Sequence, residues 1–280
     1  MLQMKAMSDA WEAHAAEIAA ARLSPGLLDE DRIASALDSE AAAYALQRRV
    51  SDILSAELGP VVGYKIGMAD REQQRKFGIS EPLFGAMHAA GQFVDQPLRV
   101  DASGPPIGLE CEIAVTLGAN LPAVGAPYDS EAVRNAVATT HAAIEIVQSR
   151  FTLLSGTRAW PLVADAVLHR GFVLSEGSAT PLGDGTPITG SIWLGGKILA
   201  EGTSRSLHGG GPLEALTWLV NKRVSLGLSM AVGDVVLCGS LIPVQWLDPA
   251  SLGKGETAAG ADFAGALPKT MLKISHSPVP

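Results

Sequence analysis

Several residue types and motifs are scarce or missing in this 280-residue sequence, and each absence narrows the classes of protein to which it can belong. The 2 cysteines, Cys111 and Cys238, provide neither a disulfide framework nor a Cys-x-x-Cys zinc or redox motif. Both lie in apolar runs, which predicts buried free thiols. The 6 histidines show no His-x-His or His-Glu-x-x-His spacing, so a zinc site is not expected. No Gly-x-Gly-x-x-Gly follows a predicted strand, so a nicotinamide or flavin cofactor is not indicated.

Excess positive charge and long apolar runs are also missing. The formal net charge is −8 and the lysines and arginines form no run, so a nucleic-acid partner is not expected. No window of about 18 apolar residues occurs, which argues against a membrane span and favours a cytoplasmic protein. The composition is instead 47% apolar and only 5% aromatic, which is typical of a globular core built from small side chains. The length suits one large domain with an appended segment.

The most informative stretch is Glu110-Cys111-Glu112, which opens an apolar, β-branched run ending at Leu117. The run predicts a buried strand, and residues two apart on a strand point to the same face. Two adjacent carboxylates without a cation would cost several kcal/mol or take up a proton. A hard cation such as Mg²⁺ or Mn²⁺ would explain the pair, since such ions prefer oxygen ligands. The alternative is a wet strand face that carries two glutamates.

A lysine stands between glycines in an earlier predicted strand, Val61–Met68. Alternation places Lys65 on the same face as Gly63 and Gly67, and glycine inside a strand often marks close approach of a ligand. Lys65 is therefore a candidate contact for an anionic ligand. The alternative is an edge-strand lysine that discourages aggregation.

A third isolated glutamate, Glu145, lies in an apolar strand that follows a predicted helix at Asp129–Thr140. It repeats the anomaly of the first two acids. Three carboxylates together with water molecules would form a plausible octahedral magnesium site.

The rest of the chain shows patterns of helices, turns and short strands, without an internal repeat. The charged residues of the N-terminal helices follow a pattern typical of a solvated surface. The tail beyond the last strong strand is expected to be mostly loop. The predicted elements are helices at Ser8–Arg22, Glu30–Leu58 (in two pieces) and Pro212–Leu226, a loop at Gly78–Gly85, a hairpin at Gly195-Gly196, and strands at Gly233–Leu241 and Thr270–Ser275.

A series of short motifs occurs in a specific order between about residues 58 and 241. They are Gly-Tyr-Lys65-Ile-Gly, Glu-Pro-Leu-Phe-Gly85, Glu110-Cys-Glu112-Ile-Ala, Ile-Glu145-Ile-Val-Gln-Ser-Arg150, Val-Ala-Asp165 and Gly-Asp-Val-Val-Leu-Cys-Gly-Ser240-Leu. In this order they resemble the hydratase and decarboxylase branch of the fumarylacetoacetate hydrolase superfamily. The resemblance implies an α+β fold, a mixed β-sandwich roll with N-terminal helices, in which residues 1–60 pack on a catalytic domain of residues 61–280.

The resemblance also implies a site with one divalent metal ion, a small 2-oxo or 2-hydroxydienoic acid as substrate, and a homo-oligomeric enzyme. The acids and the lysine that are anomalous on physical grounds are among the residues that match. The implied residues are the ligands Glu110, Glu112 and Glu145 for Mg²⁺ or Mn²⁺, the catalytic Lys65 and Asp165, and substrate contacts from Arg150, Gly239 and Ser240.

The activity implied is that of a metal-dependent lyase, which adds water to a 2-hydroxydienoate or 2-oxo-enoate and gives a 4-hydroxy-2-oxo acid. Decarboxylation of a 2-oxo dioic acid is one alternative, because the same metal-stabilised enolate serves both reactions. Hydrolysis of a carbon–carbon bond, as in acylpyruvases, is another; it needs a Glu-His pair, for which His88 and His169 are the candidates. A relative that keeps the fold and serves as a binding or assembly subunit is the non-enzymatic alternative.

The sequence departs from the branch at two places. Leu83 stands where many hydratases have an acid after Glu-Pro, and Ala166-Val167-Leu168 replaces the usual Asn-Ala-Ser after the aspartate. Both changes predict a more apolar pocket, which leaves the identity of the substrate open.

Overall fold

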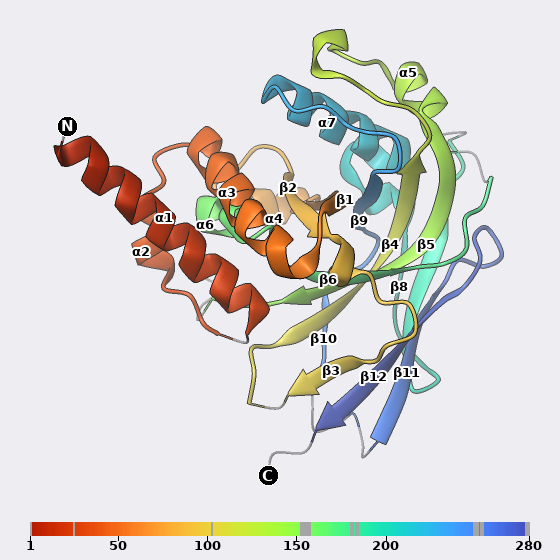
Figure 1. The fold of residues 1–280 in the computed structure, drawn as a ribbon. Coiled ribbons are helices and arrows are strands. Elements are labelled where there is room, and N and C mark those ends of the chain that lie inside the picture. Colours follow the sequence, from red (N-terminus) through yellow and green to blue (C-terminus); the bar gives the residue numbers. More distant parts are fainter. Residues whose placement is uncertain are drawn as a thin grey trace.

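The chain folds into two β-sheets that pack against each other, with helices gathered around the larger sheet (Figure 1). The computed structural model describes residues 2–24, 26–101, 103–151, 158–179, 182, 185–248, 252 and 255–277. Within these ranges no helix combines the length and the apolar character that crossing a bilayer requires.

The larger sheet has seven strands in the order β2-β1-β9-β4-β5-β6, with β10 paired to β4. Its centre is the long antiparallel pair β4 and β5, whose β-branched residues favour the extended backbone. The strands are β1 Val61–Gly67, β2 Leu83–His88, β4 Ile107–Leu117, β5 Val137–Gln148, β6 His169–Leu174, β9 Val235–Ser240 and β10 Gln245–Trp246.

The smaller sheet has five strands in the order β3-β12-β11-β7-β8. The hairpin predicted at Gly195-Gly196 is confirmed, and both glycines have positive φ (57° and 81°), which a tight two-residue turn requires. The strands are β3 Leu98–Asp101, β7 Thr189–Leu194, β8 Lys197–Thr203, β11 Gly255–Asp262 and β12 Thr270–Ser277.

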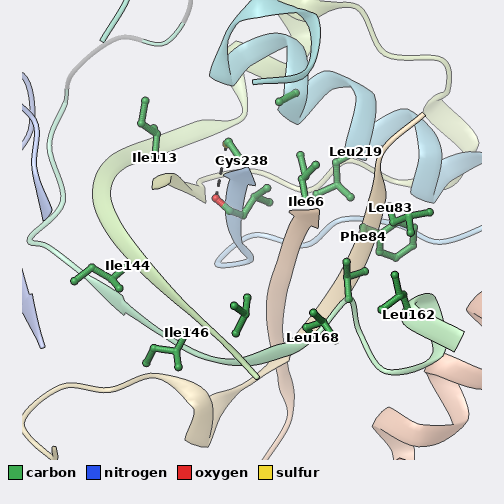
Figure 2. Packing of buried hydrophobic residues seen from close by; sticks show 14 of the residues in the cluster. Ile66, Leu83, Phe84, Ile113, Ile144, Ile146, Leu162, Leu168, Leu219 and Cys238 are labelled. Atoms are coloured by element: carbon green, nitrogen blue, oxygen red, sulfur yellow. Dashed lines mark hydrogen bonds between the residues drawn. The ribbon is translucent and has the colours of Figure 1, made fainter. Parts of the chain in front are cut away.

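Alternation along β4 and β5 separates an apolar face from an acidic face. Cys111 and Ile144 lie directly opposite each other, and both are fully buried on the side that meets the smaller sheet. On this side the Cys111 thiol lies 3.7 Å from the carbonyl oxygen of Ser191 on β7. Figure 2 shows Ile144 and Ile146 extending from the same strand into this core. Both cysteines are buried free thiols, as predicted. Glu110, Glu112 and Glu145 lie on the other face of the two strands.

Helices α1 to α3 gather on one side of the larger sheet (Figure 1). The predicted division of Glu30–Leu58 into two pieces is confirmed, since the side chains of Asp29 and Ser39 each cap a separate helix start. The division of the chain at residue 60 stays a prediction. The helices are α1 Leu2–Leu23, α2 Glu30–Ala34, α3 Glu40–Leu58, α4 Arg71–Lys76, α5 Ser130–Asn135, α6 Ala159–Ala164 and α7 Pro212–Ser225.

Helix α3 covers the free edge of the larger sheet at β2. The Tyr44 hydroxyl accepts a hydrogen bond from the Phe84 backbone nitrogen at 3.2 Å. The Gln47 side chain donates to the carbonyl oxygens of Phe84 (3.0 Å) and Val163 (2.6 Å) and accepts from the nitrogen of Ala86 (3.2 Å). Polar backbone groups that an edge strand would expose are thus satisfied by one helix.

Three predicted elements are wrong in extent. The loop predicted at Gly78–Gly85 is strand from Leu83 onward, because pairing with β1 imposes an extended backbone. The helix predicted at Asp129–Thr140 ends at Asn135, since β5 begins at Val137 and its β-branched residues pair with β4. The tail contains β11, a glycine- and alanine-rich segment with weak strand preference that is held by β7 and β12 on either side.

We expect Gln47→Leu to lower the free energy of unfolding by about 2–4 kcal/mol, because it leaves buried backbone groups of β2 and α6 without partners. Urea denaturation followed by circular dichroism measures the change. Gln73→Leu, at an exposed position of α4, is the matched control and should stay within about 0.5 kcal/mol of wild type. Equal effects of the two substitutions would contradict the role assigned to Gln47.

Candidate metal site

The register of the larger sheet brings three glutamates together. Glu110 on β4 lies directly opposite Glu145 on β5, and Glu112 follows two residues along the same face. One carboxylate oxygen from each lies within 4.8 Å of the others. Glu112 and Glu145 are fully buried, and Glu110 is half-buried. The sequence placed two of these acids on one face, and the pairing of β4 with β5 adds the third.

A bulge in β9 supplies a backbone contact to this cluster. Glu112 pairs with Ser240 while Ala114 pairs with Leu237, so β9 contains one extra residue between these positions. Gly239 within the bulge has a φ of 103°, which favours glycine, and its N–H donates to Glu112 Oε2 at 2.8 Å. Gly239, predicted as a substrate contact, thus orients a carboxylate in this structure. Among the described residues, the Ser240 hydroxyl makes long contacts of 3.4 Å to backbone groups and no shorter ones.

Lys65 reaches the same cluster from β1. Its Nζ lies 3.2 Å from Glu145 Oε1, and both side chains are buried. Burial disfavours the ammonium form, but the charges of Glu145 and the two other glutamates outweigh it, so the pKa of Lys65 is raised. The glycines beside it are needed for space, because a Cβ on Gly67 would lie 3.2 Å from Nζ and 2.7 Å from Val167 Cγ1.

The charges of the cluster do not balance within the protein. Three carboxylates, if all were ionised, and one ammonium would leave two negative charges in excess. Burial and the neighbouring carboxylates raise the pKa of Glu110 to about 8 and raise that of Glu112 well above its ordinary value. In the described part of the chain, Glu112 Oε1 and Glu145 Oε2 are buried without a hydrogen-bond partner. Oxygen donors that lack partners and an excess charge of minus two fit a hard divalent cation.

His169, one of the two histidines considered for a Glu-His pair, supports Glu145 from β6. Its Nδ1 lies 2.9 Å from Glu145 Oε1, on the fully buried side of the site. Burial, together with the positive charges of Arg22, Lys65 and Arg150, holds the pKa of His169 well below its ordinary value, so the ring is neutral. Nδ1 then carries the hydrogen and donates it to the carboxylate. His88 instead contacts the carbonyl oxygen of Gly59 at 3.0 Å.

Arg150 and Asp165 form a buried ion pair behind the glutamates. Arg150 Nε donates to Asp165 Oδ1 at 2.8 Å, Nη1 donates to Gln148 Oε1 at 3.2 Å, and Nη2 donates to the His169 carbonyl oxygen at 2.8 Å. Neither side chain is exposed. The pair fixes the start of the strand that carries His169. A direct role of either residue with substrate stays a prediction.

No local signal in the sequence points to Arg22, and the charge pattern of α1 predicts that this residue lies on a solvated surface. That interpretation is wrong, because Arg22 is only 8% exposed and its Nη2 lies 3.4 Å from the His169 carbonyl oxygen. Helix α1 therefore contributes a side chain that contacts the backbone of His169, behind the three glutamates. Only the tertiary structure reveals this contact.

A left-handed turn after Asp165 forms one wall beside the lysine. Ala166, Val167 and Leu168 have φ values of 55°, 54° and 64°, which is unfavourable for residues with a Cβ. Gly85 makes room for the turn, since a Cβ there would lie 2.3 Å from the Ala166 carbonyl oxygen. Leu83 lies opposite Gly67, on the face of β1 and β2 that carries Lys65. The two departures from the family motifs therefore place apolar side chains on the lysine side of the site.

Comparison with known proteins gives two relatives of similar length. The chain is 32% identical over 233 residues to a 2-keto-4-pentenoate hydratase of Paraburkholderia phymatum, covering 72% of this chain and 76% of that protein. It is also 32% identical over 259 residues to a 2-keto-4-pentenoate hydratase of Burkholderia vietnamiensis, covering 81% and 84%. No protein-family model matches the chain.

Solved structures share the fold. A 4-oxalocrotonate decarboxylase from Pseudomonas putida G7, complexed with magnesium and adipate, matches with a TM-score of 0.80 at 18% identity over 96% of this chain and 98% of that chain. A fumarylpyruvate hydrolase from Pseudomonas aeruginosa, in complex with Mn²⁺ and pyruvate, matches with a TM-score of 0.56 at 14% identity over 78% and 91%. The predicted α+β roll with N-terminal helices is confirmed by this likeness.

We expect Glu112→Gln to weaken Mn²⁺ binding by about 100-fold or more, because it removes one charge and a donor that Gly239 holds in place. Isothermal titration calorimetry measures the dissociation constant. Glu131→Gln, at an exposed position of α5, is the control and should bind Mn²⁺ as wild type does. Unchanged affinity in Glu112→Gln would overturn the proposed ligand set.

Metal-free protein should become less stable as the pH rises from about 4.5 to about 8. In the folded state Glu110 keeps its proton up to its raised pKa of about 8, whereas in the unfolded state it loses the proton near the ordinary value of 4.5. The stability that is fully present below pH 4.5 is therefore lost as the pH rises to about 8. Thermal unfolding in EDTA across this range measures the trend. Saturating Mg²⁺ or the substitution Glu110→Gln should reduce the slope, and a metal-free stability that increases over the same range would contradict the repulsion inferred here.

Proposed function

Since this chain belongs to the 2-keto-4-pentenoate hydratase branch of the fumarylacetoacetate hydrolase superfamily, we propose that it is a divalent-metal-dependent hydro-lyase. Its reaction adds water to a 2-hydroxydienoate or 2-oxo-enoate and gives a 4-hydroxy-2-oxo acid. The observation that carries this proposal is the convergence of three glutamates, two of them fully buried, with one lysine. Mg²⁺ or Mn²⁺ is the proposed ion, since both prefer carboxylate oxygens.

Glu110, Glu112 and Glu145 would hold the metal, and the N–H of Gly239 and the ring of His169 orient two of these carboxylates. Once bound, the ion supplies a Lewis acid that stabilises negative charge on the substrate oxygen at C2. Because these contacts already hold the two carboxylates in position, the carboxylates do not have to reorganise during the reaction.

Lys65 is proposed as the acid. The charges of the three glutamates outweigh its burial and raise the pKa of Lys65, which favours the ammonium form that an acid needs. As the C2 hydroxyl group becomes a carbonyl, its proton leaves to water, and C5 at the end of the diene gains a proton that the Lys65 ammonium is placed to deliver. The Lys65 amine then regains a proton from water, so the numbers of protons lost and gained are equal. Water then adds across the conjugated double bond, with its oxygen at C4 and a proton at C3. The hydroxyl of Ser240, which has no short partner among the described residues, is proposed to contact the substrate carboxylate.

The names of the two relatives favour hydration over decarboxylation of a dioic acid, since both are 2-keto-4-pentenoate hydratases at 32% identity. Likeness to a decarboxylase at 18% identity shows the fold alone.

Quaternary structure and location are part of the proposal. We infer a homo-oligomer from the family resemblance, and the exposed side chains Leu23 and Leu27 beside α1 offer apolar surface for subunit contacts. Light scattering of the purified protein tests the oligomer. A cytoplasmic location is inferred from the resemblance alone.

With Mg²⁺ or Mn²⁺, the protein should consume 2-hydroxypenta-2,4-dienoate and form a product heavier by one water. Loss of ultraviolet absorbance measures the rate, and mass spectrometry identifies the product. Release of CO₂ from a 2-oxo dioic acid, without hydration of the dienoate, would assign the decarboxylase instead.

In the same assay Lys65→Met should lower kcat by about 10²–10⁴-fold, because the proton donor is lost. Its Mn²⁺ affinity should stay equal or increase, since a positive charge beside Glu145 has been removed. Lys197→Met, at an exposed position of β8, is the control for the loss of a lysine and should keep wild-type activity. Full activity in Lys65→Met would exclude Lys65 as the acid.

A further inference from the structure

A cavity of about 170 Å³ lies on the opposite side of β1 from the metal site. Tyr64 on β1 and the paired Ala86 on β2 face this cavity, whereas Lys65 points to the other face. Helices α3 and α7 form the remaining walls. The lining residues that could contact a ligand include Tyr44, Ser51, Tyr64, Phe84 and Arg223.

Two polar side chains of the lining are buried and incompletely bonded. Arg223 is only 5% exposed; its Nη2 donates to the Ser229 carbonyl oxygen at 3.0 Å, but its Nε has no hydrogen-bond partner among the described residues. Ser51 is 6% exposed, and its hydroxyl likewise has none in the described ranges. A buried donor without an acceptor is destabilising, and more so when it is charged. Both groups therefore favour a ligand that accepts hydrogen bonds.

The other walls are aromatic and apolar. The rings of Tyr44 and Phe84 stack with centroids 4.2 Å apart, and Tyr64 meets Phe84 edge-on at 6.2 Å. The Arg223 guanidinium lies 3.5 Å above the Tyr64 ring, which holds it in a fixed plane. An engineered apolar cavity of about 150 Å³ is known to bind benzene, so the volume here suits one six-membered ring with a small substituent.

The charges of the residues that line the cavity favour a ligand with a negative charge. Arg223 is buried, whereas Arg48 and Asp52 are exposed and oppose each other. Arg223 is thus the buried positive charge of the lining, which the charge of Asp234 outside the lining and the Tyr64 hydroxyl offset in part. A guanidinium and a hydroxyl that line one cavity suit a single carboxylate, and the rings suit an aromatic body.

We propose that this cavity is a second ligand site, for a small aromatic monocarboxylate of the size of benzoate. The ring packs against Tyr44, Tyr64 and Phe84, and the carboxylate accepts hydrogen bonds from Arg223 Nε and the Ser51 hydroxyl. The proposal is independent of the hydratase reaction, since its residues lie on the other face of the sheet from the three glutamates.

Isothermal titration of the full chain with sodium benzoate, in saturating Mg²⁺, tests the site. Wild type should bind one benzoate per chain, and Ser51→Leu should weaken binding at least tenfold because leucine fills the cavity and removes the donor. Ser55→Leu, one turn along α3 and outside the lining, is the matched control and should bind within about twofold of wild type. Benzoate binding that is unchanged in Ser51→Leu would overturn the proposal.

Two further measurements test whether the carboxylate is recognised and whether benzoate binds in this cavity or at the metal site. Benzamide, which has the same shape without the charge, should bind wild type at least tenfold more weakly than benzoate; equal binding would overturn the carboxylate assignment without requiring any variant to fold. Repeating the benzoate titration with Glu112→Gln separates this cavity from the metal site. Binding retained in Glu112→Gln supports the cavity, and binding lost there would assign the benzoate to the metal and overturn the proposal.

Discussion

The repulsion among three buried carboxylates is the constraint on which the rest of this structure depends. Strands β4 and β5 bring the acids together, and three neighbouring strands each contribute a group that compensates them: Lys65 from β1, the Gly239 N–H from β9 and the neutral ring of His169 from β6. These contacts offset only part of the charge. A divalent ion would supply the rest, and the same excess charge that destabilises the metal-free protein is then the source of its metal affinity.

The scaffold around the acids holds its parts in place at some cost to the local backbone. The turn at Ala166–Leu168 adopts left-handed conformations that cost roughly 1–2 kcal/mol per residue. Gly67 and Gly85 leave the space that this turn needs. Helix α3 satisfies the edge of β2 through Gln47, which also binds the carbonyl oxygen of Val163 on α6. The strands and the turn are thereby fixed relative to each other.

Strand β1 serves two chemically different environments. Lys65 faces the charged cluster, while Tyr64, the residue before it, faces an aromatic cavity with a buried guanidinium. The alternation of side chains along a strand keeps these environments apart, although the residues are adjacent in sequence. One strand can thus carry the proposed acid on one face and the proposed ligand surface on the other.

Local sequence determined the strand carrying Glu110 and Glu112, their common face, the strand carrying Lys65 and most helices, because periodicity and capping act over a few residues. It did not determine where β2 begins, where α5 ends, or the existence of β11, since these depend on pairing with distant strands. Tertiary structure alone decided that Glu145 lies opposite Glu110, that His169 supports it, and that Arg22 is buried behind them. Register and burial are set by contacts between segments far apart in the chain, which local patterns do not encode.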